Sequence, residues 1–125
     1  MVREGGSVGV MADLGRRAHG RFGEDRAAAW YEANGYAVLA RNWRTREGEL
    51  DLIARKDGVV VFCEVKARAS NAFGAPVEAV TRAKQQQVRH MAVVFLADQG
   101  LRAAELRFDV VSVLSGKVEV IEGAF

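Results

Sequence analysis

The spacing of apolar and polar residues first predicts two helices. Residues 14–34 and 81–98 both place apolar side chains at the spacing of one helical face. Asn34-Gly35 and Gly100 follow these segments and are typical helix C-terminal signals. The expected face consists of Leu14, Ala18, Phe22, Ala29 and Ala33 in the first helix, and of Lys84, Val88, Met91, Ala92 and Phe95 in the second.

In five other segments, apolar and polar residues alternate as they do in strands. These segments cover residues 36–43, 49–55, 59–66, 105–114 and 117–121. Asp57-Gly58 and Ser115-Gly116 are typical of tight hairpin turns. The expected fold is therefore α/β with the order α-β-β-β-α-β-β, in which helices pack on a central mixed sheet. We expect residues 1–13 to form a flexible N-terminal tail and residues 14–125 to form a single domain.

Composition narrows the class of protein. The 125 residues are enough for one ordinary domain, and 50% hydrophobic with 27% charged residues is a globular composition. No stretch approaches the ~20 apolar residues of a membrane span, and no signal-peptide core is present. We therefore expect a cytoplasmic protein that does not bind membranes. A single cysteine, Cys63, and two histidines exclude the usual structural zinc sites.

The charge is distributed unevenly along the chain. The formal net charge is only +2, yet seven arginines lie between positions 16 and 46, where only three acids occur. Fourteen of the eighteen basic residues are arginine, which suits bidentate contact with phosphate. On charge alone, a nucleic-acid partner and an ordinary solvated surface are equally compatible with this distribution. The oligomeric state, a dimer included, stays open.

The predicted hairpin brings ionisable residues together. If Asp57 and Gly58 form the turn, Lys56 faces Val59, and the same register sets Asp51 opposite Glu64 and Glu49 opposite Lys66. Because side chains alternate along a strand, all four would share one face of the sheet. Opposite residues have Cβ atoms ~4.5 to 5.5 Å apart, so the four groups would be crowded.

Two opposed carboxylates repel each other, and a divalent cation removes that penalty. Mg²⁺ or Mn²⁺ bound by Asp51 and Glu64 would fill its other positions with water and phosphate oxygens, with Lys66 beside them. Without metal, at least one of the two acids should titrate above its ordinary pKa. Surface ion pairs are the alternative. The apolar residues on both faces of these strands favour a site, and regular alternation puts Leu50 and Leu52 together on the face away from Glu64. Cys63 shares that face as a buried, unreactive thiol.

Glu24 is a third candidate ligand. It lies on the first helix among small residues, including Gly20, Gly23 and Ala27, which would let the helix approach the sheet closely. If the helix packs on the sheet, Glu24 should point toward Asp51 and Glu64. From spacing alone, the pattern favours a surface glutamate.

Several blocks together resemble a known family. Phe22-Gly23-Glu24, Asn42-Trp43-Arg44, GELDLIA (48–54), VFCEVKAR (61–68), FGAPVEAV (73–80) and Lys84 resemble the YraN-type (UPF0102) family of small bacterial proteins. That family is assigned to the restriction-endonuclease-like superfamily, close to archaeal Holliday-junction resolvases. The resemblance implies a restriction-endonuclease-like fold. Its nuclease signature would be Asp51 as the first acid, Glu64 and Lys66 as the Glu-x-Lys end, and Glu24 as the helical glutamate.

The leading hypothesis is a Mg²⁺- or Mn²⁺-dependent endonuclease that hydrolyses DNA phosphodiesters, with branched or damaged DNA among the candidate substrates. The alternatives are a nucleic-acid-binding module of the same fold that does not cleave, and a protein-interaction scaffold. The expected catalytic residues are Asp51, Glu64, Lys66 and Glu24, and the expected metal ligands are Asp51, Glu64 and Glu24. The expected nucleic-acid-binding residues are Arg16, Arg17, Arg21, Arg41, Arg44, Arg46, Arg68 and Lys84.

Overall fold

A computed structural model describes residues 11–68 and 80–125, and describes side chains over 21–67 and 80–125. Within these ranges the chain forms two helices and one five-stranded sheet, in the predicted order. The elements are α1 (Met11–Ala33), β1 (Ala37–Thr45), β2 (Gly48–Lys56), β3 (Val59–Arg68), α2 (Arg82–Gln99), β4 (Glu105–Leu114) and β5 (Lys117–Ile121). Helix α1 therefore includes the last three residues of the predicted tail, whereas residues 1–10 and 69–79 lie outside the described residues.

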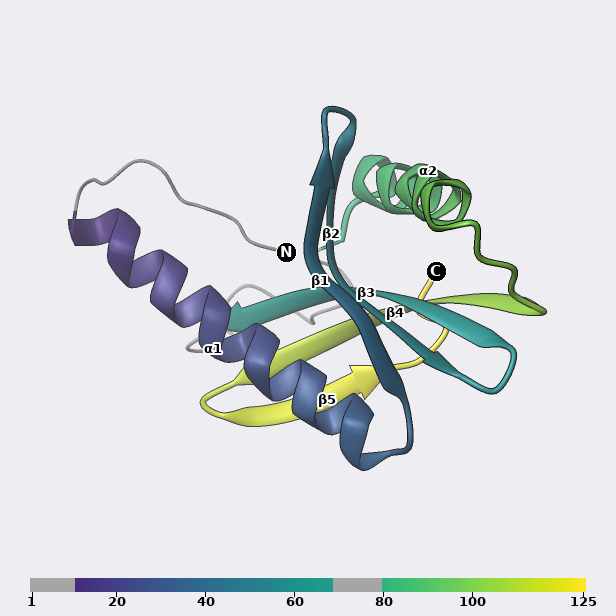
Figure 1. The fold of residues 1–125 in the computed structure, drawn as a ribbon. Helices are drawn as coiled ribbons and strands as arrows, with labels where there is room; N and C mark the ends of the chain where they lie inside the picture. Colours follow the sequence, from purple (N-terminus) through teal and green to yellow (C-terminus); the bar gives the residue numbers. More distant parts are fainter. Residues whose placement is uncertain (1–10, 69–79) are drawn as a thin grey trace.

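The strands follow the order β1-β2-β3-β4-β5 across the sheet. Neighbours are antiparallel except for β3 and β4, which run parallel and are connected through α2. The fold is thus α/β with a mixed sheet, as predicted. Helix α1 lies across one face, whereas α2 packs beside the upper part of the β1–β2 hairpin, on the other face (Figure 1).

Each face of the sheet has its own apolar core. On the α1 side, Tyr31 packs with residues of β2, β3 and β4, among them Leu52 and Cys63. On the α2 side, Met91 and Phe95 pack with Phe62 and neighbouring residues. The structure confirms that a sheet with two apolar faces is covered on both. It also confirms the predicted burial of Cys63 away from Glu64, and burial raises the pKa of this thiol.

The predicted apolar face of α1 is wrong over its described part. Phe22, Ala29 and Ala33 are exposed, whereas the small residues Gly23 and Ala27 face the sheet. A Cβ added at Gly23 would lie 2.7 Å from the Cβ of Ala67 on β3, far inside normal contact. Close backbone approach at Gly23, together with the buried Tyr31 side chain, therefore fixes α1 on the sheet. The predicted positions of Leu14, Ala18 and Gly20 lie where side chains are not described.

Helix α2 has well-defined ends. Thr81 is the N-cap, and its side chain accepts a hydrogen bond from the Lys84 N–H, while Gly100 ends the helix in the left-handed conformation (φ 60°). Val88, Met91, Ala92 and Phe95 are buried, as predicted. Across the residues that the structure describes, no helix is long and apolar enough to cross a membrane.

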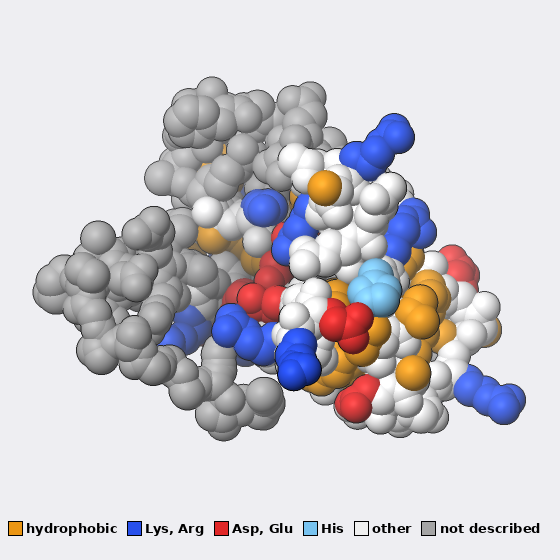
Figure 2. Space-filling view, turned by 90° about the horizontal axis from the view of Figure 1, so that it is seen from above, with side chains coloured by type: hydrophobic (Ala, Val, Ile, Leu, Met, Phe, Trp, Pro, Cys, Tyr) orange, Lys and Arg blue, Asp and Glu red, His pale blue; other side chains and the backbone are white. Residues whose placement is uncertain are grey.

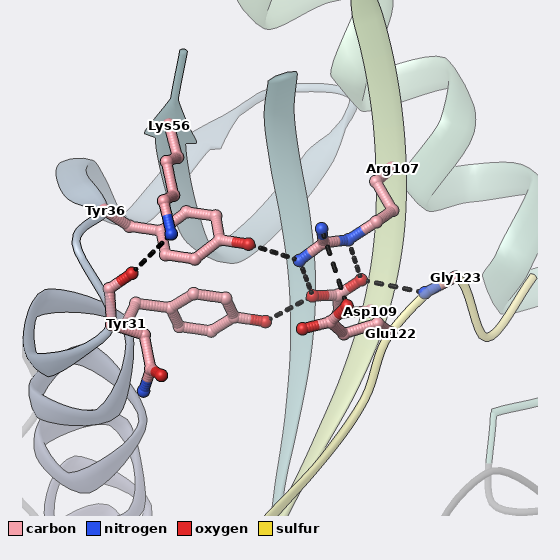
Figure 3. A network of polar contacts seen from close by, with 8 residues as sticks. Tyr31, Tyr36, Lys56, Arg107, Asp109, Glu122 and Gly123 are labelled. Carbon is pink, nitrogen blue, oxygen red and sulfur yellow. Dashed lines mark hydrogen bonds and ion pairs between the residues drawn. The ribbon is translucent and has the colours of Figure 1, made fainter. Parts of the chain in front are cut away.

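A buried polar network ties the C-terminal segment to α1 and β4 (Figure 3). The fully buried Asp109 carboxylate accepts hydrogen bonds from the Tyr31 hydroxyl (2.6 Å), from two nitrogens of Arg107 (both 2.9 Å) and from the Gly123 N–H (3.0 Å). Arg107 also donates to the Tyr36 hydroxyl. Because Asp109 has these donors on several sides, the network satisfies a buried charge and has a structural role.

The contact between Gly23 and Ala67 yields a stability prediction. In an exposed helix, Gly→Ala would gain about 1 kcal/mol from helix propensity. Here the new methyl group must push α1 away from β3, so Gly23→Ala should lower the free energy of unfolding by about 1 to 3 kcal/mol, as measured by urea denaturation.

The double variant Gly23→Ala/Ala67→Gly is the matched control, because it removes the opposing methyl group. It should be more stable than the sum of the two single changes implies. A Gly23→Ala protein as stable as the wild type would show that α1 is not held by close packing on β3.

Candidate active site

At one point along the β1–β2 hairpin, the alternation of side chains between the two faces of the sheet reverses in both strands. Arg41 pairs with Leu52, and Trp43 pairs with Leu50. Leu52 lies in the α1-side core, whereas Leu50 and Trp43 lie in the α2-side core. Regular strands would keep Leu50 and Leu52 on the same face, so the chain must be irregular between them.

The irregularity lies at Asn42 and Asp51, the residues between these pairs. Asn42 is in the left-handed conformation (φ 52°), which asparagine tolerates better than most residues. Beyond this point the hairpin bends away from β3–β5 toward α2 (Figure 1). The sequence prediction that Leu50 shares a face with Leu52 is therefore wrong, because it assumed an unbroken strand.

Strands β2 and β3 separate at the same point. Their pairing has the predicted register from Lys56–Val59 to Leu52–Cys63 and ends there, one pair before Asp51 and Glu64. The Val65 N–H, which this register would set opposite Leu50, donates instead to Oδ2 of Asp51 at 2.9 Å. The Asp51 side chain thus takes the place of a backbone acceptor at the point where the two strands part.

Glu64 is the buried acid of the pair. Its side chain is 5% exposed, and Oε2 lies 3.7 Å from Nζ of Lys66 and 3.5 Å from Nζ of Lys84. Lys66 is two residues along β3, and Lys84 comes from the first turn of α2. A buried carboxylate requires such partners, because an unpaired charge in the interior is costly.

Burial and neighbouring acidic groups change the pKa of Asp51. Burial, followed by the charge of Glu64, raises the pKa of Asp51 from 3.8 to about 7, and Glu24 and Glu49 add to the effect. The Val65 N–H works in the opposite direction, because it stabilises the ionised carboxylate. The raised pKa of Asp51 agrees with the prediction that at least one of the two acids titrates above its ordinary range.

Glu24 approaches the pair from the α1 side. It is half-buried, and Oε1 accepts a hydrogen bond from Nδ2 of Asn42 at 2.7 Å. Burial raises the pKa of Glu24, and its charge acts on Asp51. Over residues 11–68 and 80–125, however, no three His, Cys, Asp or Glu residues are grouped closely enough to hold a metal ion. Among the described residues, the two carboxylates of the site are thus those of Asp51 and Glu64. The hydrogen bond from Asn42 holds Glu24 next to them.

The predicted pairing of Glu49 with Lys66 is wrong, because the strands part before reaching these residues. Glu49 instead forms an ion pair with Arg44 on β1, at 3.2 Å. Lys66 lies beside Glu64 on its own strand. The four ionisable groups therefore do not form two cross-strand pairs.

The predicted phosphate-binding arginines fall into three groups. Arg41 is paired with Asp25 at 2.5 Å, and Arg44 with Glu49. Arg21 and Arg46 are exposed, and neither has an ion-pair partner among the described side chains. Arg16, Arg17 and Arg68 lie where side chains are not described. Viewed from above, acidic side chains lie directly beside Lys and Arg side chains (Figure 2).

Two residues of this site have roles that the sequence pattern did not predict. Asn42 sets the bend and holds Glu24, and its signal was a lone asparagine inside an otherwise strand-forming segment. Lys84 faces Glu64 rather than only solvent. Its position on the predicted apolar face of the second helix was the feature of the sequence that could have indicated this role. On the exposed surface, Nε2 of His90 lies 2.6 Å from Oε1 of Glu47.

Comparison with known proteins identifies relatives over most of the chain. The model of the "Uncharacterised protein family UPF0102" matches residues 23–113. A UPF0102 protein of Beutenbergia cavernae is 48% identical over 111 residues, which cover 85% of this chain and 94% of that protein. Similar proteins of Nocardia farcinica (47%; 86% of each chain) and Frankia alni (44%; 92% of this chain and 100% of that protein) also match.

The raised pKa of Asp51 has a defined effect on stability. A carboxyl whose pKa is higher in the folded than in the unfolded state binds an extra proton when folded, so stability is lost as pH rises from about 4 to about 7. Asp51→Asn keeps an acceptor for the Val65 N–H and does not ionise. In EDTA it should therefore be more stable than the wild type by at least about 1 kcal/mol at pH 8, as measured by urea unfolding.

This gain should disappear toward pH 4, where both proteins carry a neutral side chain at position 51. Asp98→Asn, a change on the exposed end of α2, is the matched control and should show no comparable pH-dependent gain. An equal loss of stability in Asp51→Asn at all pH values would show that Asp51 is not destabilised by its neighbours.

Proposed function

This chain belongs to the UPF0102 protein family, and from the site that it carries we propose that it is a metal-dependent endonuclease that hydrolyses DNA phosphodiesters. The main support is the pair Asp51 and Glu64 at the parting of β2 and β3, with Lys66 ion-paired beside Glu64. The Asp and Glu-x-Lys pattern of the restriction-endonuclease-like superfamily has the same residue types. We place the protein in the cytoplasm, where DNA is accessible.

The residues fit Mg²⁺ or Mn²⁺. Both side chains offer hard carboxylate oxygens, which these cations prefer. The Val65 N–H donates to Oδ2 of Asp51, and Oδ1 accepts no hydrogen bond from the described residues, so Oδ1 can serve as a ligand. Burial and the charge of Glu64 disfavour the ionised form of Asp51, and a nearby cation would offset both effects. Asp51 and Glu64 would hold the metal, and Glu24 would act from the α1 side.

When bound, the metal would lower the pKa of a water molecule and neutralise charge on the phosphate. The protein supplies the surroundings. The Val65 N–H fixes the orientation of Asp51, and Asn42 fixes that of Glu24. Lys66, whose side chain is 31% exposed, can reach both Glu64 and a bound phosphodiester, where its ammonium group would stabilise developing negative charge.

DNA backbone contacts would come from the arginines around this site. Arg21 and Arg46 are exposed, so binding phosphate would not require them to leave a described ion-pair partner. Arg41 and Arg44 would first have to leave Asp25 and Glu49, which are themselves part-exposed and weakly held. Release of counterions from DNA by such contacts would make binding depend steeply on salt.

We expect purified protein to nick or cut at least one of linear, flapped and four-way DNA in millimolar Mg²⁺ or Mn²⁺, as measured by gel electrophoresis. Asp51→Asn should lower the cleavage rate by at least about 100-fold, because one of two metal ligands is lost. EDTA should have the same effect. The matched control Asp98→Asn should cleave at the wild-type rate, because Asp98 lies in the last turn of α2, at the end opposite Lys84.

The outcomes separate the two candidate functions. Tight, salt-sensitive DNA binding without cleavage in either metal would support the non-cleaving module. Cleavage that survives Asp51→Asn or EDTA would contradict the proposed site, because the activity would then come from elsewhere or from a contaminant.

A further inference from the structure

Lys84 stands in an unusual place for a lysine. It lies in the first turn of α2, which also contains Arg82 and no acidic residue. The N-terminal end of a helix carries partial positive charge, so basic residues are disfavoured there. An interaction outside the helix must compensate, and the ion pair that the structure provides for Lys84 is with Glu64.

The geometry of the contact between Lys84 and Glu64 allows the Lys84 ammonium group to exchange Glu64 for another anionic partner. Both Lys84 and Lys66 approach the same oxygen, Oε2, at 3.5 and 3.7 Å. These distances are longer than those of a direct N–H···O hydrogen bond, which are ~2.7 to 3.2 Å. The two lysine side chains are about one-third exposed, whereas Glu64 is 5% exposed. The carboxylate is therefore fixed in the interior, and the ammonium groups can turn toward a ligand from solvent.

A divalent cation at Glu64 would share that carboxylate with two positive charges. Like charges only a few ångströms apart repel strongly in a partly buried site. A phosphate group removes the conflict, because it gives both ammonium groups a new anionic partner. The cation and the phosphate should thus bind better together than either does alone.

We propose that Lys84 is the resident counterion of Glu64 and that its transfer to a nucleic-acid phosphate couples metal binding to substrate binding. This inference rests on the proposed metal site and adds its regulation. Lys84 acts through Glu64 in the metal-free protein, as a positioning residue, and contacts the phosphate only in the loaded site. Because binding linkage is reciprocal, phosphate must improve metal affinity by the same factor as metal improves phosphate affinity.

The test measures Mn²⁺ affinity by electron paramagnetic resonance of free Mn²⁺, with and without thymidine 5′-monophosphate. This probe carries a phosphate but no phosphodiester, so cleavage cannot interfere. For the wild type, the nucleotide should tighten Mn²⁺ binding by about tenfold, a typical coupling. Lys84→Met should bind Mn²⁺ alone about tenfold more tightly than the wild type, because one repelling charge is gone, and should show a smaller effect of the nucleotide.

Two control variants separate the charge of Lys84 from its packing and from the net charge of the protein. Lys84→Arg keeps the charge and should behave like the wild type. Lys117→Met makes the same charge change on β5, separated from β3 by β4, and should leave Mn²⁺ affinity unchanged. A role of Lys84 in folding alone would weaken Mn²⁺ binding or leave it unaltered, and would not tighten it.

A second readout needs no metal. In EDTA, a double-mutant cycle between Lys84→Met and Glu64→Gln should show a favourable coupling in urea unfolding, and zero coupling would overturn the counterion role. Equal Mn²⁺ affinity in the wild type and Lys84→Met would also overturn it, while the proposed nuclease function would stand. No Mn²⁺ binding by either protein, with or without nucleotide, would contradict the proposed function itself.

Discussion

The structure of this site depends on the separation of β2 and β3 at Asp51. A regular sheet would continue the backbone ladder and keep Asp51 and Glu64 as opposed side chains on one face. Instead, the faces of β1 and β2 reverse between the pairs Arg41–Leu52 and Trp43–Leu50, where Asn42 has a left-handed backbone. The Asp51 carboxylate takes the Val65 N–H. The Asp51 side chain thereby ends the ladder while keeping the backbone of β3 satisfied.

The two helices position the other groups around this point. The close contact of Gly23 with Ala67 sets α1 directly on β3, and the next residue, Glu24, reaches Asn42. On the other face, the N-terminal turn of α2 brings Lys84 to Glu64. The sheet carries the acids, and each helix contributes one charged side chain from its own side. The cost of burying Glu64 is offset by two ammonium groups, whereas Asp51 has only a backbone donor among its described hydrogen-bond partners.

Sequence patterns predicted the parts of the fold that follow regular periods. Asp57-Gly58 predicted the hairpin register, and the apolar face of α2 was correct from Val88 to Phe95. Periodicity failed where geometry departs from regularity. It put Leu50 on the wrong face because the alternation along β2 reverses between Leu50 and Leu52. It predicted the wrong face of α1 because glycine and alanine contribute little hydrophobicity. The sequence pattern did not predict the role of Asp109, because two of its donors, Tyr31 and Gly123, lie 78 and 14 residues away along the chain. The roles in metal and DNA binding remain predictions.

The proposed function requires that Asp51 and Glu64 jointly bind a divalent cation where β2 and β3 part. Anomalous scattering from crystals grown with Mn²⁺ and thymidine 5′-monophosphate is the sharpest test, because it locates the metal without relying on activity. We expect an anomalous peak about 2 Å from an oxygen of each carboxylate. Saturating Mn²⁺ that gives no peak between these two residues, or a peak bound only by other groups, would show that the two acids do not form the metal site.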